Sequence, residues 1–189
     1  MPLRHSSLAS LLGDAFRVCL GASFLLALSK VTVVLPFSPV PVTGQTLAVL
    51  LLGVTLGSRR GLASVMTYIG LGISGLPVFA LGAGPSYLLG PTGGYLAGFA
   101  LAAWLSGLVQ ERLATEDTER DFIRRLACTT LALLAGTAAI YACGLPWLAR
   151  FTGWARVLRL GFYPFIPGDV CKLIIAGVVV LTGRRLTRR

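Results

Sequence analysis

Apolar residues in this chain are gathered into six long stretches, separated by polar, proline-rich or glycine-rich segments. The stretches cover residues 14–35, 45–57, 61–75, 95–109, 126–145 and 166–183. About 20 apolar residues are enough to cross a bilayer as an α-helix. We therefore predict an all-α membrane protein with six transmembrane helices, although the second stretch is short for a full crossing.

The polar segments are too short for a separate soluble domain, so residues 1–189 are predicted to form a single integral membrane domain. Its predicted polar parts are an N-terminal tail at 1–13, a loop at 111–125 and a C-terminal tail at 184–189. The composition agrees with this class, because 55% of the residues are hydrophobic and 13% are charged. Soluble domains average about 25% charged residues.

The formal net charge of +10 is explained by membrane topology. Twelve of the 17 Lys and Arg residues fall on one side of the six-helix arrangement. The other five are Arg150, Arg156 and Arg159 on the opposite side, and Lys30 and Lys172 inside apolar stretches. Because Lys and Arg accumulate in cytoplasmic loops, both termini of this multi-pass protein of the cell membrane are predicted to be cytoplasmic. Membrane lipid is thus an expected partner, and nucleic acid is not.

The segment at 148–162 mixes three Arg residues with aromatic and aliphatic residues. This mixture is typical of an amphipathic helix that lies on a membrane surface, here the outer one. A lid over a binding site is the alternative interpretation.

Several kinds of chemistry lack their usual residues in this sequence. The chain has no Gly-Lys pair and hence no P-loop, so any energy from ATP has to come from a partner. A single histidine, His5, and four cysteines without a C-x-x-C pair argue against a metal site. No common hydrolase motif occurs either. We therefore expect a binding function without a cofactor, and not an enzyme.

The segment FYPFIPGDVCK, residues 162–172, is the strongest candidate for a binding site. Pro167 favours the start of a helix, and Asp169 and Lys172, three residues apart, lie on one face of that helix. Ionisable residues at membrane depth are costly and usually face a cavity. The alternative is a mutual ion pair near the outer surface, without a ligand.

A second candidate is PVPVTGQT, residues 39–46, which leads into the second apolar stretch. Thr43 and Gln45 offer hydroxyl and amide groups at a helix start, where unpaired backbone N–H groups can receive a ligand. A plain N-cap by Thr43 is the alternative.

A third candidate is GPTGGY, residues 90–95, on the same, extracytoplasmic side. Gly93 and Gly94 let the backbone approach a ligand closely, and Tyr95 supplies an aromatic wall with a hydroxyl group. Irregular backbone at membrane depth is tolerated where it lines a cavity, so we expect the three segments to converge on one.

The first apolar stretch carries small residues at every fourth position. These are Ala15, Cys19, Ser23 and Ala27. Such a stripe lets another helix approach closely. Internal packing and a docking face for another membrane subunit are both open interpretations.

Four motifs follow one another along the chain: PVPVTGQTLAVLLLG, LPVF, LLGPTGGYLAGF and FIPGDVCK. Together they resemble the biotin-specific S component (BioY) of energy-coupling-factor (ECF) vitamin transporters, over residues 15–185. The resemblance implies the six-helix architecture of ECF S components and the capture of biotin near the outer face. It also implies a transmembrane T component and two ATPase subunits as partners.

The resemblance further implies which residues bind biotin. The acidic and basic pair of the last helix corresponds to Asp169 and Lys172, and the proline-rich and glycine-rich loops contribute the other candidates. The predicted set is Asp169, Lys172, Gln45, Thr43, Gly93, Gly94 and Tyr95.

In our hypothesis, Asp169 accepts from a ureido N–H of biotin and Lys172 donates to the ureido oxygen. The carboxylate would meet backbone N–H groups of the glycine-rich loop or an outer Arg such as Arg150 or Arg156. The stripe on the first helix resembles the Ala-xxx-Ala docking motif of the family, from which Cys19 and Ser23 depart.

Three alternatives remain open at this stage. The chain could be an S component for another vitamin, such as thiamine or riboflavin, but a cation would favour acidic cavity residues and only Asp169 is available. It could be a small membrane enzyme that uses Asp169 and Lys172 as acid and base. It could also be a structural membrane subunit without a ligand.

Overall fold

The computed structural model describes residues 8–114 and 121–186, which are mostly helical. The helices are α1 (Leu8–Ser29), α2 (Gln45–Leu56), α3 (Ser58–Ile73), α4 (Pro85–Leu89), α5 (Gly93–Leu113), α7 (Phe122–Thr152), α8 (Trp154–Gly161) and α9 (Ile166–Leu186). Two short antiparallel strands, β1 (Thr32–Val33) and β2 (Val42–Thr43), form a hairpin between α1 and α2. The prediction of a helical protein is confirmed, and the hairpin adds local order to the predicted irregular link.

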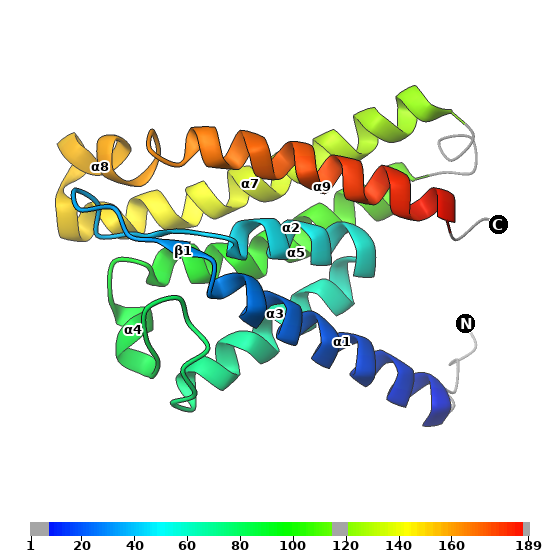
Figure 1. Ribbon diagram of the computed structural model, residues 1–189, viewed down its shortest axis with the longest axis horizontal. Coiled ribbons are helices and arrows are strands. Elements are labelled where there is room, and N and C mark those ends of the chain that lie inside the picture. The colour runs from blue at the N-terminus through cyan, green and yellow to red at the C-terminus, as the bar shows by residue number, and fades with distance from the viewer. Residues whose placement is uncertain (1–7, 115–120, 187–189) are drawn as a thin grey trace.

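The long helices pack side by side in one bundle (Figure 1). The most extensive helix pair is α5 and α7, while α9 packs on α2 and α7, and α1 packs on α2 and α3. The first turn of α1 and the last turn of α9 lie at the same end of the bundle, on the right in Figure 1. The hairpin, α4 and α8 lie at the opposite end, so the bundle has two chemically different ends.

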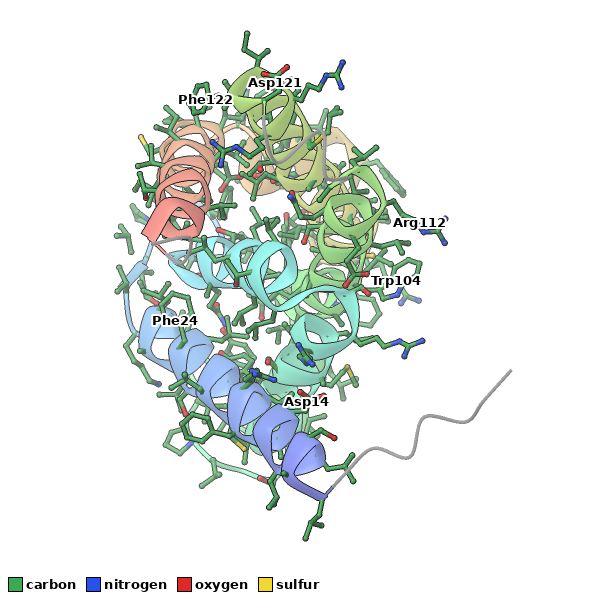
Figure 2. All side chains as sticks on the ribbon, turned by 90° about the vertical axis from the view of Figure 1, so that its right-hand side faces the viewer. Asp14, Phe24, Trp104, Arg112, Asp121 and Phe122 are labelled. Carbon is green, nitrogen blue, oxygen red and sulfur yellow. The ribbon has the colours of Figure 1, made fainter. Side chains whose placement is uncertain are left out.

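The outer surface of the bundle is strongly apolar. Phe24 and Trp104 point outward from its sides (Figure 2), and both side chains are exposed. Within the described ranges, α1 and α7 are long and apolar enough to cross a membrane. Helices α8 and α9, bent by 47° relative to each other, make a third candidate when taken as one span. This surface suits a multi-pass membrane protein.

The ends of several helices differ from the predicted boundaries. Helix α1 begins within the predicted tail, at Leu8, and α9 continues to Leu186. Both α5 and α7 extend into the predicted loop at 111–125, of which 115–120 lie outside the described residues. Helix α7 can begin early because the Asp121 side chain accepts a 2.9 Å hydrogen bond from the backbone N–H of Ile123.

The predicted amphipathic segment at 148–162 is divided between two helices. Helix α7 passes through Pro146 and ends at Thr152, and α8 begins at Trp154. Between them, Gly153 has a φ of 77°, a conformation that glycine adopts without strain. Arg156 and Arg159 are exposed on α8, so the short helix keeps the predicted mixture of basic and apolar residues.

Two acidic residues join neighbouring helices to the first turn of α3. Both carboxylate oxygens of Glu111 accept hydrogen bonds from Ser58, at 2.7 Å from its backbone N–H and 2.8 Å from its hydroxyl. Asp14 pairs with Arg17 at 2.9 Å and with Arg60 at 2.8 Å. These carboxylates therefore have structural partners at the end that carries most of the Lys and Arg residues within the described ranges.

Candidate functional site

A cavity opens near the end of the bundle where α5 and α9 begin. The empty space in it, with the open mouth included, is about 680 Å³. Its walls come from the link before α2 and from α2, α5, α7 and α9. All three predicted segments, 39–46, 90–95 and 162–172, contribute residues to its lining.

Asp169 and Lys172 lie side by side on the first turns of α9 and line this cavity. The Lys172 Nζ is 3.3 Å from Asp169 Oδ1, and the side chains are only 14% and 13% exposed. Lys172 Nζ also donates to Thr46 Oγ1 at 2.8 Å, and the Tyr141 hydroxyl donates to Asp169 Oδ2. The ion pair considered as an alternative does form, but it forms in the wall of a cavity. An ammonium has three N–H donors, so Lys172 keeps one for a ligand.

Thr43 and Gln45 also line the cavity, where α2 begins. The Thr43 hydroxyl donates to Gln45 Oε1 at 3.0 Å, and it accepts from the backbone N–H of Gln45 at 3.3 Å. Gln45 Nε2 donates to the Tyr68 hydroxyl at 2.6 Å. The N-cap of α2 is Gly44, without a side-chain cap, so the alternative of an N-cap by Thr43 is wrong. The Thr43 hydroxyl instead orients the Gln45 amide. That amide retains one N–H and one oxygen lone pair.

The glycine-rich segment contributes to the cavity differently from the prediction. Tyr95 lines the cavity, and its hydroxyl donates to the carbonyl oxygen of Gly161 at 2.9 Å. Gly93 and Gly94 are buried and do not line it. A Cβ atom at Gly93 would overlap the Leu88 carbonyl oxygen, and one at Gly94 would overlap the Trp147 side chain. The close approach that these glycines permit is to protein atoms of neighbouring segments.

Sequence reasoning missed the contribution of α7 to the cavity. Thr137, Ile140 and Tyr141 line it from the middle of α7, and Tyr141 reaches Asp169. Their spacing of three and four residues places them on one helix face. A hydroxyl-bearing face inside an apolar stretch was the available signal. Tyr87 and Phe165 add aromatic surface from the segments before α5 and α9.

The small-residue stripe of α1 faces outward. All four of its residues are exposed: Ala15, Cys19, Ser23 and Ala27. Internal packing of α1 instead uses Ala22 and Leu25, together with Gly21, at which a Cβ atom would lie 2.9 Å from Ser64 Cβ. The stripe is therefore available for contact with another helix.

Lys30 and Arg150 also find partners at this end of the bundle. Lys30 Nζ donates to the carbonyl oxygens of Pro77 and Phe79, at 2.6 and 3.1 Å, and Lys30 does not line the cavity. The Arg150 guanidinium lies over the Trp147 ring, 5.1 Å from its centroid. Of the two lysines in apolar stretches, only Lys172 contributes to the cavity.

Comparisons with known proteins agree on one family. The model of the BioY family matches residues 4–189. A probable biotin transporter BioY of Lysinibacillus sphaericus is 38% identical over 153 residues, covering 77% of this chain and 74% of that protein. The biotin transporter BioY of Thermotoga maritima is 38% identical over 154 residues, covering 80% and 85%. That of Rhizobium etli is 33% identical over 169 residues, covering 88% and 90%.

One solved structure shares the fold. It is the crystal structure, at 2.1 Å, of the S-component for biotin from an ECF-type ABC transporter. It matches with a TM-score of 0.79, and the alignment covers 95% of both chains at 24% sequence identity. The similarity extends over nearly the whole bundle.

Proposed function

Because the chain belongs to the BioY family, we propose that it is the biotin-binding membrane subunit of an ECF-type biotin uptake transporter. The observation that carries this proposal is the cavity in which Asp169, Lys172 and Gln45 lie together among apolar and aromatic walls. The names of its relatives, biotin transporters, point to the same ligand.

The polar groups of the cavity complement the ureido ring of biotin. This ring has two N–H donors and one carbonyl acceptor. Asp169 accepts from one N–H, the free N–H of Lys172 donates to the oxygen, and Gln45 with Thr43 completes the set. Charge-assisted hydrogen bonds of this kind contribute about 1.5–3 kcal/mol each. Tyr95 covers the apolar ring system of biotin. Gly93 and Gly94 allow the start of α5 to pack closely on its neighbours, which places the Tyr95 ring in the cavity wall.

The carboxylate of biotin points toward the mouth of the cavity in this proposal. The available donors are backbone N–H groups of residues 90–95 and the outer arginines Arg150 and Arg156. Arg150 is close to that loop, because Trp147, under its guanidinium, donates from Nε1 to the Gly90 carbonyl oxygen at 2.9 Å.

The arrangement of the helices supports capture from outside. We propose that α1, α2, α3, α5, α7 and α9 cross the membrane, with both termini cytoplasmic. The first turn of α1 and the last turn of α9 lie at one end of the bundle, as an even number of crossings requires (Figure 1). That end also carries most of the Lys and Arg residues that the structure describes, and the cavity lies near the other end.

Import by this subunit depends on partners in our proposal. The exposed stripe of α1 offers a transmembrane T component a surface for close helix packing. Two ATPase subunits supply the energy, since the chain has no P-loop of its own.

A titration of the purified protein with biotin and with thiamine tests this function. We expect saturable binding of biotin and none of thiamine, because the only acidic side chain that lines the cavity, among the described residues, is already paired with Lys172. Uptake of labelled biotin in cells, with and without the T component and ATPases, tests the role of the partners. Binding of thiamine in preference to biotin would favour an S component for another vitamin.

A further inference from the structure

The loop of residues 77–79, which follows α3, is held by side chains of α1 and α3. The Val78 carbonyl oxygen accepts from the Tyr68 hydroxyl at 3.0 Å. The Ser29 hydroxyl lies 2.7 Å from the same oxygen and shares its one hydrogen between it and the Leu26 carbonyl oxygen. Lys30 donates to the carbonyl oxygens on either side of Val78. Three successive carbonyl groups of this loop therefore have fixed partners.

Tyr68 connects the 77–79 loop to the cavity. Its side chain is fully buried, and Gln45 is only 5% exposed. The Tyr68 hydroxyl has one hydrogen, which goes to Val78, so toward Gln45 it acts as the acceptor. The nitrogen of the Gln45 amide must therefore face Tyr68, and its oxygen faces Thr43. The 77–79 loop thus determines, through Tyr68, the orientation of the Gln45 side-chain amide.

The same loop supports a second residue of the cavity wall. The Phe79 ring, fully buried, stacks on the ring of Tyr87, with centroids 4.8 Å apart and planes at 16°. It also meets Tyr68 edge-on, at 5.6 Å. A Cβ atom at Gly72 would overlap the Phe79 ring, so α3 has to present glycine there. Both Gln45 and Tyr87, which line the cavity, are thereby supported from the 77–79 loop.

We propose that Tyr68 is a positioning residue for biotin, which orients the Gln45 amide by coupling it to the 77–79 loop that Ser29 and Lys30 clamp. The free N–H and lone pair of that amide then meet the ureido group in a fixed order. The proposal rests on biotin being the ligand, as proposed above. It gives a role to Lys30, the lysine of the first apolar stretch, which does not line the cavity.

The test compares Tyr68→Phe with the control Tyr163→Phe, since Tyr163 is exposed and does not line the cavity. Biotin affinity of the purified protein is measured for each, alone and combined with Gln45→Met. We expect Tyr68→Phe to weaken binding about fivefold, because the Gln45 amide loses the hydrogen-bond partner that orients it. In the Gln45→Met background it should change binding little, because the group on which Tyr68 acts is gone. Lys30→Met should also weaken binding, and Lys30→Arg, which still donates to carbonyl groups, should restore it.

A measurement without ligand separates this proposal from the proposed function. Hydrogen–deuterium exchange of the ligand-free protein should be faster at residues 43–47 and at Val78 and Phe79 in Tyr68→Phe, and unchanged there in Tyr163→Phe. If the wild-type protein does not bind biotin, the proposed function fails, and the exchange experiment still decides the coupling. Unchanged exchange in Tyr68→Phe would overturn the proposal. So would a loss of biotin affinity of the same size with and without Gln45.

Discussion

The Lys172 ammonium on α9 donates a 2.8 Å hydrogen bond to the Thr46 hydroxyl on α2. The two residues are 126 positions apart in the sequence. Lys172 is also paired with Asp169 on its own helix, at 3.3 Å. A fully exposed ion pair contributes only about 0–1 kcal/mol to stability, whereas these two side chains are largely enclosed in a cavity wall. This enclosure, with further partners on α2 and α7, agrees with the proposed role of the pair in ligand binding.

Replacement of Tyr141 by Phe removes the hydroxyl that donates to Asp169 Oδ2. We expect biotin affinity to fall about fivefold, because the carboxylate loses a fixed partner. Thermal stability should change little, since the ring and its edge-on contact with Phe162 remain. Isothermal titration of both proteins in detergent measures the effect. An unchanged affinity would show that Tyr141 does not orient Asp169 for the ligand.

Gly93 and Gly94 should affect stability more than binding chemistry. A Cβ atom at either position would overlap neighbouring protein atoms, so Gly93→Ala and Gly94→Ala are each expected to destabilise the protein by about 1–3 kcal/mol. Gly70→Ala is the matched control, because no atom lies within 4 Å of a Cβ placed there. Thermal unfolding in detergent compares the three variants. Equal melting temperatures for all three would contradict the packing role.

The sequence was sufficient to predict the Asp169 and Lys172 pair because its basis is local. Helical spacing puts the two residues on one face, and Pro167 marks the helix start that the structure shows. Thr43 and Gln45 were predicted for the same reason, as polar residues where a helix begins.

The contribution of Tyr141 could not be predicted in the same way. Its contact with Asp169 joins α7 to α9 across 28 residues, so it depends on how those helices pack. Local sequence also cannot say what approaches a glycine. A glycine permits the close approach of a ligand or of a neighbouring segment equally well. At Gly93 and Gly94 the atoms that approach closely belong to the protein itself.

The exposed stripe of α1 predicts a defect in transport without a defect in binding. Ser23→Trp places a large side chain on the surface proposed for the T component. We expect biotin uptake in cells with all subunits to fall at least about tenfold, as close helix packing requires small residues. Biotin binding by the purified subunit should be unchanged. Val179→Trp, on an exposed part of α9, is the control and should leave uptake intact; equal uptake by both variants would argue against docking at this stripe.

The outer arginines should speed the capture of an anionic ligand. We expect Arg150→Gln, Arg156→Gln and Arg159→Gln combined to lower the association rate of biotin at least about threefold at low salt. The effect should shrink at high salt and be absent for the neutral methyl ester of biotin. Stopped-flow binding measures both ligands. Neutralising three exposed arginines elsewhere, Arg59, Arg112 and Arg124, is the control, and an equal loss there would show a general effect of charge.

The central claim is that Asp169 and Lys172 hold the ureido group of biotin. The most direct test is a calorimetric titration of biotin into the wild-type protein, Asp169→Asn and the control Asp14→Asn, whose carboxylate pairs with Arg17 and Arg60 outside the cavity. Asp169→Asn should bind at least tenfold more weakly, a loss of about 1.4 kcal/mol, while Asp14→Asn binds like the wild type. Equal affinities for the wild type and Asp169→Asn would contradict the claim.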